Sequence, residues 1–157
     1  MIIGVTGSRN WTSRLIIRRA FDEAWEEHPD HSSPVVLIEG GARGADLECK
    51  TEAIRRGWHP ASMQALWGFY GNAAGHVRND AMVYLGVTVA HRWLAFINPC
   101  FKKDCTVPRP HDSHGAAQCA AAARLAGIRV KEYRNGLPAA VRSLCGDVVA
   151  AAPAAVP

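Results

Sequence analysis

The feature that most constrains the fold of this chain is a regular alternation of short apolar runs with longer, helix-like segments. The apolar runs cover residues 2–6, 34–39, 59–66, 92–97 and 128–133. The segments between them have helical patterning, at residues 13–28, 43–56, 79–85 and 115–126. Strands that alternate with helices are joined by crossovers, as parallel neighbours require. The alternation therefore predicts an α/β fold, with a mostly parallel five-stranded sheet and helices on both faces.

The order of the strands follows from where the turns lie. Glycine or small polar residues follow the first, second and fourth strands directly. Right-handed crossovers then place the reversal of strand order between the first and fourth strands. The predicted order is 3-2-1-4-5.

Length and composition indicate one domain. The chain has 157 residues, of which 48% are hydrophobic, which is enough for one core. From Gly146 onward the sequence is rich in alanine, proline and valine without a period. We expect a single domain over residues 1–145 and a flexible tail over 146–157.

Several features predict a cytoplasmic protein without a membrane segment. The five cysteines are odd in number and irregularly spaced, which argues against a disulfide framework. The first residues lack the basic lead of a signal peptide, and the apolar runs are shorter than the ~20 residues of a membrane span. The net charge of +4 comes from scattered residues, so ligand phosphate explains it as well as DNA does.

Three loops should meet at one edge of the sheet. They are residues 7–10, 40–46 and 113–116, which follow the first, second and fourth strands. Ligands of open parallel sheets bind at the carboxyl ends of the strands. Glycines let backbone amides approach a ligand, and helix N-termini favour anions. We expect a bound phosphate against the amides of residues 40–45 or of residues 7–9.

A further glycine and arginine cluster, residues 71–79, opens another helix. Arg9, Arg43 and Arg78 can each bind phosphate through two hydrogen bonds. Neither this cluster nor the loop at 40–46 is a Walker A loop or a dinucleotide-binding Gly-x-Gly-x-x-Gly motif. The predicted ligand-binding residues are Gly7, Ser8, Arg9, Gly40, Gly41, Arg43, Gly44, Asp46, Gly75, Arg78, Asn79 and Gly115.

Some candidates have two interpretations. Asp46 can hold a ligand hydroxyl or cap its helix. Glu39 can contact a ribose or end its strand in solvent. The aromatic residues Trp67, Phe69 and Tyr70 can stack on a base or pack within the protein.

Three stretches together resemble the YspA-like, YpsA-related SLOG family. They are Thr6–Arg9, Gly40–Asp46, and the spaced pattern from Trp67 through Gly71, Gly75 and Arg78-Asn79 to Met82. The resemblance extends over about residues 2–133. It implies a Rossmann-like three-layer sandwich that binds nucleotides or nucleotide-derived ligands such as ADP-ribose. Many members of the family are encoded by phages and actinobacteria, which implies the host cytoplasm for a phage-encoded member.

Relatives of this family include the LOG phosphoribohydrolases and the DNA-processing protein DprA. Where LOG enzymes have an arginine followed by a lysine, this chain has Arg78-Asn79. In the stretch that matches the LOG Gly-Gly-x-Gly-Thr-x-x-Glu motif, Gly115 is kept, but Ala116 replaces the threonine and Cys119 the glutamate. A thiol cannot replace this carboxylate in glycosidic chemistry. The resemblance thus favours a sensor or sequestering protein over a hydrolase. LOG-like hydrolysis and DprA-like DNA binding remain the alternatives, and no catalytic residue is assigned.

One loop raises the question of a metal. Cys100, Cys105, His111 and His114 approach the spacing of a zinc site without matching it cleanly. A solvated loop with incidental thiols is the preferred interpretation, and Cys119 is expected in the core. We predict no metal and no cofactor. Nucleic acid is disfavoured as a partner because no basic stripe is present, and a homo-oligomer is left open.

Overall fold

The protein is described by a computed structural model, which covers residues 1–135. Its five strands are β1 (Ile2–Gly7), β2 (Val36–Glu39), β3 (His59–Ser62), β4 (Arg92–Phe96) and β5 (Val130–Tyr133). Its helices are α1 (Arg14–Glu26), α2 (Ala45–Arg55), α3 (Trp67–Tyr70), α4 (Ala74–Val89) and α5 (His114–Leu125), with a 3₁₀ turn η1 (Gly71–Ala73) before α4.

The predicted topology is confirmed. The strands form one sheet of order β3-β2-β1-β4-β5, and every neighbouring pair is parallel. In β1, Gly4 pairs with Trp93 of β4 on one side and with Ile38 of β2 on the other. Since β1 is central, the chain crosses from one half of the sheet to the other between β3 and β4. The reversal of strand order thus lies between β1 and β4.

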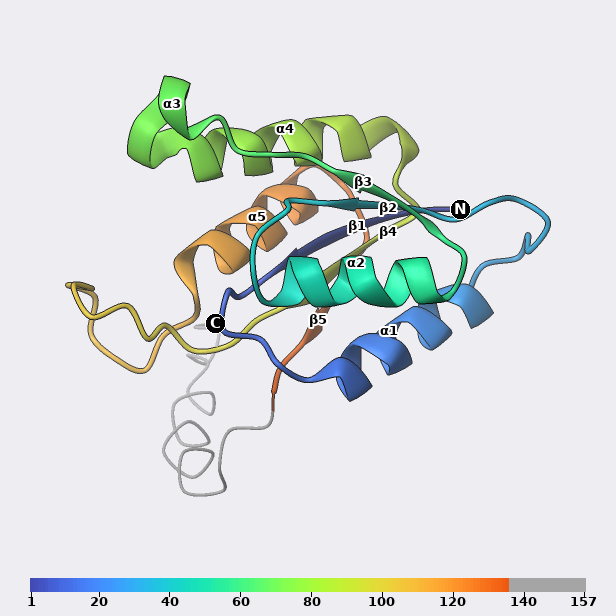
Figure 1. The fold of residues 1–157 in the computed structure, drawn as a ribbon, viewed down its shortest axis with the longest axis horizontal. Helices are drawn as coiled ribbons and strands as arrows, with labels where there is room; N and C mark the ends of the chain where they lie inside the picture. Colours follow the sequence, from blue (N-terminus) through green and yellow to red (C-terminus); the bar gives the residue numbers. More distant parts are fainter. Residues whose placement is uncertain (136–157) are drawn as a thin grey trace, which may run out of the picture.

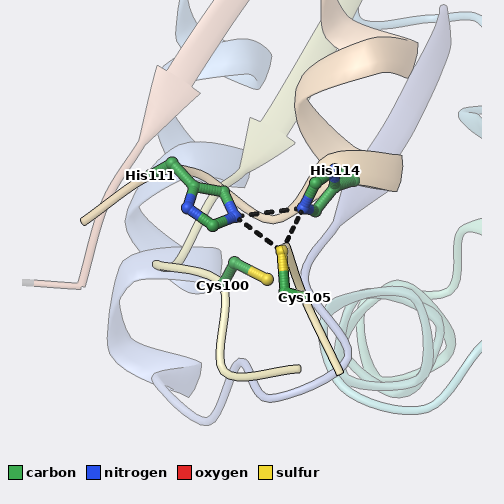
Figure 2. Close-up of side chains that lie close together, drawn as sticks. All are labelled: Cys100, Cys105, His111 and His114. Carbon is green, nitrogen blue, oxygen red and sulfur yellow. Dashed lines mark hydrogen bonds between the residues drawn. The ribbon is translucent and has the colours of Figure 1, made fainter. Parts of the chain in front are cut away.

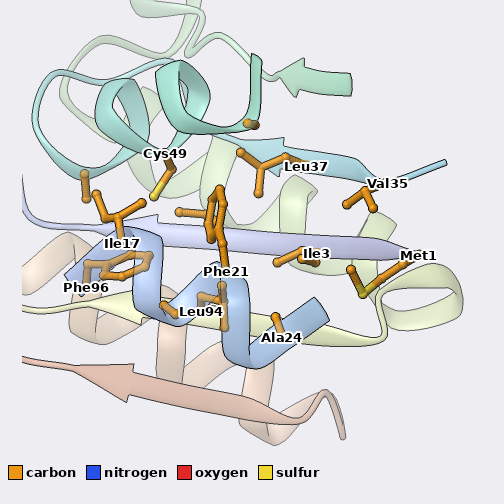
Figure 3. Packing of buried hydrophobic residues seen from close by; sticks show 14 of the residues in the cluster. Met1, Ile3, Ile17, Phe21, Ala24, Val35, Leu37, Cys49, Leu94 and Phe96 are labelled. Atoms are coloured by element: carbon orange, nitrogen blue, oxygen red, sulfur yellow. The ribbon is translucent and has the colours of Figure 1, made fainter. Parts of the chain in front are cut away.

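The helices form a layer on each face of the sheet (Figure 1). Helices α1 and α2 pack on Ile3, Leu37 and Leu94, and Phe21 of α1 lies at the centre of that cluster (Figure 3). Helices α4 and α5 pack on the other face, against Ile38 and Trp93. Alternate residues of each strand thus point to opposite layers, as the pleat of a strand dictates.

The structure corrects several details of the sequence-based assignment. The third strand is shorter than predicted and ends at Ser62. The region predicted as a loop, residues 67–75, holds α3, η1 and the start of α4. The apolar pattern of α1 suggests that Leu15 faces the core, but Leu15 is exposed and Ile17 is buried there. Ile17 lies three and four residues before Ala20 and Phe21, so these three side chains share one helical face.

The predicted tail, residues 146–157, lies outside the described residues, as do the last ten residues assigned to the domain. Among the helices of residues 1–135, none has the length and apolarity needed to cross a bilayer.

Candidate functional site

A cleft of about 490 Å³ opens at the carboxyl ends of β1 and β4. Its volume falls in the range of small-molecule sites. The loops after β1, β2 and β4 all contribute to it, as do the first turns of α4 and α5. In Figure 1 this edge of the sheet lies on the left, where α2, α4 and α5 begin. The convergence of loops predicted from the sequence is therefore present.

The charged side chains of the cleft are mostly cationic. Arg9, Arg43, Arg78 and Lys102 line it, and Asp46 is the carboxylate among the lining residues that the structure describes. Arg9 and Arg43 are exposed at the surface. Such an excess of positive charge in a concave site attracts anions.

Asp46 and Arg78 form the most buried charged pair of the cleft, with side chains 7% and 11% exposed. Arg78 Nη1 lies 3.5 Å from Asp46 Oδ2. Burial raises the pKa of Asp46 to about 6, against the opposing effect of Arg78. Arg78 Nε and Nη1 are buried and have no hydrogen-bond partner among the described residues. Buried donors without acceptors are rare, and each calls for an explanation, such as a water or an ion that supplies the acceptor.

The glycine-rich loops pack closely on one another. Gly44 has φ +81°, and a Cβ there would lie 2.5 Å from the carbonyl oxygen of Ser8. A Cβ on Gly40 would collide with the Arg78 guanidinium. These glycines therefore let the loop after β2 approach the loop after β1 and leave room for Arg78.

Ser8 is the junction between the three loops. Its carbonyl accepts hydrogen bonds from the amides of Trp11 (3.1 Å) and Ala45 (3.2 Å). Its hydroxyl accepts one from the amide of Asn98 at 2.8 Å, and its own amide donates to Phe96 at 2.9 Å. Ser8 is fully buried, so its role is to join the loops and not to contact a ligand.

The amides that we expected to cradle phosphate are largely occupied. The amide of Gly41 donates to Glu39, that of Ala42 to Asp46 at 3.3 Å, and that of Ala45 to Ser8. The beginning of α5 offers amides instead, since the side chain of its N-cap residue Ser113 does not bond to them. Gly75 of α4 and Gly115 of α5 lie on the cleft wall.

The predicted site residues divide into two groups. Those that line the cleft are Gly7, Arg9, Arg43, Asp46, Gly75, Arg78, Asn79 and Gly115. Those outside its lining are Ser8, Gly40, Gly41 and Gly44. The second group supports the wall from behind, as the loop packing shows. Gly41 adds a backbone conformation with φ +65°, which favours glycine.

Of the three aromatic residues in the predicted loop, Trp67 lines the cleft. Its side chain is half exposed, and the guanidinium of Arg9 lies 5.9 Å from the centre of its ring. Phe69 and Tyr70 are exposed and lie outside the cleft lining. Trp67 thus offers a flat apolar surface beside a cation.

Two residues with candidate acid–base or nucleophilic roles do not reach the cleft. Glu39 is completely buried, and its carboxylate accepts hydrogen bonds from Ser62 and from the amide of Gly41. The interpretation of Glu39 as a solvent-exposed strand end is therefore wrong. Cys119 is also completely buried, and burial raises the pKa of its thiol to about 11. Its place in the core, as predicted, keeps the thiol protonated at neutral pH.

The long loop after β4 contributes residues that the sequence did not single out as ligand contacts. Phe101 and Lys102 line the cleft from this loop, and Asn72 and His76 line it from the other side. The sequence offered one indication that this loop contributes to the cleft: the loop follows the strand at which the strand order reverses, where ligands of such sheets bind. The same loop brings together Cys100, Cys105, His111 and His114, where incidental thiols were expected.

Comparison with known proteins gives two matches. The model of the YspA, cpYpsA-related SLOG family matches residues 1–70. The Gene 61 protein of Mycobacterium phage D29 is 35% identical over 98 residues, covering 54% of this chain and 70% of the phage protein. No solved structure matches the chain. The family match covers β1 to α3, with Arg9, Arg43, Asp46 and Trp67 of the cleft, and ends before Arg78.

Proposed function

Because this chain belongs to the YspA, cpYpsA-related SLOG family, we propose that its cleft binds a nucleotide or nucleotide-derived ligand carrying phosphate and ribose. The observation that carries the proposal is the cationic cleft at the reversal of strand order, with four basic side chains around one buried carboxylate. The protein would act as a sensor of this ligand or sequester it. Its place would be the cytoplasm, that of the host if a phage encodes it.

The phosphate groups would lie between the basic side chains and the beginning of α5. Arg9, Arg43 and Lys102 surround the opening, and Gly115 exposes the first turn of α5. Free amides and the helix dipole favour an anion at this position. Arg78 would complete its hydrogen bonds with the same ligand, because its buried Nε and Nη1 have no hydrogen-bond partner among residues 1–135.

The rest of the ligand would use the polar and aromatic residues of the cleft. Asp46, ionised above its pKa of about 6, can accept a hydrogen bond from a ribose hydroxyl. Trp67 can stack on a base, since its ring is half exposed at the rim. A phosphate, a ribose and a base together fit a cleft of about 490 Å³.

Isothermal titration of the purified full chain tests this proposal. The probes are ADP-ribose, AMP and adenosine, and native mass spectrometry of protein purified without added ligand shows what co-purifies. We expect ADP-ribose and AMP to bind and adenosine to bind more weakly, because it lacks the phosphate that the arginines would hold. Equal binding of AMP and adenosine, or no binding of any of the three, would contradict the proposal.

Matched variants place the site. Arg9→Ala combined with Arg43→Ala removes two exposed cleft cations and should weaken AMP binding at least about 10-fold. Arg19→Ala is the control, because Arg19 lies on α1 outside the cleft and pairs with Glu23. If the control and the double variant lose affinity equally, the effect comes from net charge and the cleft is misassigned.

A further inference from the structure

Four metal-ligating side chains meet beside the cleft. Cys100, Cys105, His111 and His114, here called the Cys/His cluster, each offer one sulfur or nitrogen atom, and these atoms all lie within 4.8 Å of one another. Figure 2 shows the two imidazole rings turned toward the Cys105 sulfur, with Cys100 beside them. Two members, Cys100 and His114, also line the cleft.

The distances within the cluster match the edges of a small tetrahedron. His111 Nε2 and His114 Nε2 are 3.0 Å apart, and Cys105 Sγ lies 3.4 Å and 3.2 Å from them. Tetrahedral zinc holds two nitrogens about 3.3 Å apart, and a nitrogen and a sulfur about 3.5 Å apart, given its usual bond lengths. These three atoms therefore fit three corners of a zinc tetrahedron, and the Cys100 sulfur lies within 4.8 Å of them, near enough to provide the fourth.

The backbone holds the two halves of the cluster together. Pro99 and Asp112 form an antiparallel bridge, and the amide of Cys100 donates to the carbonyl of His111 at 2.8 Å. The guanidinium of Arg134 donates two hydrogen bonds, of 2.6 Å and 2.9 Å, to the carboxylate of Asp112. The backbones of Cys100 and His111 are thus directly hydrogen-bonded, and this bond keeps the two residues side by side.

The histidine geometry is that of a metal ligand. His111 Nδ1 lies 2.8 Å from the carbonyl oxygen of Pro108, so it must carry the proton and donate. In the neutral ring, Nε2 then presents a lone pair toward Cys105 and His114. Metal-bound histidines in proteins are oriented in this way, with the distant nitrogen bonded to a carbonyl.

We propose that the Cys/His cluster binds one zinc ion. Two sulfurs and two nitrogens in a tetrahedron are typical of zinc. Two thiolates balance the charge of the ion, so the site would be neutral beside a cationic cleft. The spacing is Cys-x4-Cys-x5-His-x2-His, and it departs from common zinc motifs because only two residues separate the histidines. His114 is the first residue of α5.

The zinc would be structural. Four protein ligands fill its coordination sphere and leave no position for water or substrate. It would join the loop after β4 to the beginning of α5, and so fix the wall that carries Phe101 and Lys102. This inference stands on the cluster alone and does not depend on the identity of the ligand in the cleft.

Elemental analysis of the full chain, expressed with added zinc, tests the site. We expect about one zinc ion per chain. Replacing zinc by Co²⁺ should give the visible absorption of tetrahedral cobalt together with a thiolate-to-cobalt charge-transfer band. Cys105→Ser and His111→Asn should each lower the zinc content well below the parent value and remove or shift the cobalt bands.

The controls use a cysteine and a histidine outside the cluster. Cys49→Ala and His59→Asn should retain the zinc and the cobalt spectrum, since Cys49 is on the buried face of α2 and His59 is on the edge strand β3. A parent protein that holds no zinc and gives no cobalt charge-transfer band would overturn the proposal. So would iron–sulfur absorption, a Cys100–Cys105 disulfide detected by mass, or full zinc content in Cys105→Ser.

Discussion

Arg78 and Asp46 carry the strongest functional signal among individual residues. Both are largely buried, they lie 3.5 Å apart, and within residues 1–135 the guanidinium Nε and Nη1 have no hydrogen-bond partner. A buried ion pair costs desolvation of both charges, so it is weak evidence for stability alone. A ligand that supplies the missing acceptors, as proposed above, would explain its position in the cleft.

We predict that Arg78→Ala weakens ADP-ribose binding about 10- to 150-fold, as expected for losing hydrogen bonds to a charged group. Arg78→Lys should recover little of the affinity, because an ammonium cannot hold two phosphate oxygens in one plane. Titration calorimetry with a parallel thermal melt is the measurement. Unchanged affinity with a lower melting temperature would show that Arg78 only supports the loop against Asp46.

The second residue-scale prediction concerns pH. Asp46 has a folded-state pKa of about 6, above the ordinary value of 3.8, because of burial. A raised pKa favours folding at low pH, and that contribution is lost as pH rises from about 4 to about 6. As the pH rises from 4 to 7, the free energy of unfolding of Asp46→Asn should therefore increase relative to that of the parent, by up to roughly 3 kcal/mol.

Urea unfolding of parent and variant across this pH range measures the difference. Other titrating groups are common to both proteins and cancel in the comparison. A difference that stays constant with pH would show that Asp46 titrates at an ordinary value in the folded protein.

At the scale of elements, the first turn of α5 contains a residue, Gly115, that has free space around its Cα. Gly115 lines the cleft, and a Cβ built on it meets no atom within 4 Å. A side chain can therefore be added there without disturbing the fold. A negatively charged side chain at this position should weaken the binding of an anionic ligand without lowering the stability of the fold.

We predict that Gly115→Asp weakens AMP binding by more than about 10-fold through repulsion of the phosphate. The same carboxylate should leave the melting temperature unchanged or raise it, because a negative charge in the first turn favours the helix. Gly115→Asn is the control of similar shape without charge. If both variants lose affinity equally, the side chain only blocks the cleft and the phosphate lies elsewhere.

The elements also show what the sequence could predict. The strand order followed from the alternation of strands and helices, which local patterns reveal. Helix α3 was missed because Gly68 and Gly71 flank its aromatic residues and suggest a loop. The role of Gly44 could not be predicted either, since it depends on contact with Ser8, 36 positions earlier in the chain. The Cys/His cluster depends likewise on a backbone bridge that spacing alone does not show.

At the scale of the whole molecule, the described lining of the cleft is mostly cationic and holds fewer carboxylates than a glycosidase uses. Two carboxyl groups flank the bond in most enzymes that cleave glycosidic bonds. Among the lining residues, Asp46 is the carboxylate, and it pairs with Arg78. Cys119, which the resemblance aligns with the LOG glutamate, lies on the buried face of α5.

We therefore predict that the protein does not release free base from AMP at an enzymatic rate. Chromatography of the incubated nucleotide is the measurement, with the heat-denatured protein as control. Base released at about 1 per second or faster would overturn the prediction. Asp46→Asn would then test whether Asp46 supplies the acid–base chemistry, because Glu39 is too deeply buried to do so.

The hydrogen bonds of Ser8 have a consequence for the kinetics and thermodynamics of recognition. One buried residue joins the loops after β1, β2 and β4, so they cannot open independently. A ligand therefore meets a preorganised binding surface, and the loops lose little conformational entropy when it binds. Loosening this junction would spread its effect over all three loops, and would appear as faster amide exchange along the whole edge of the sheet.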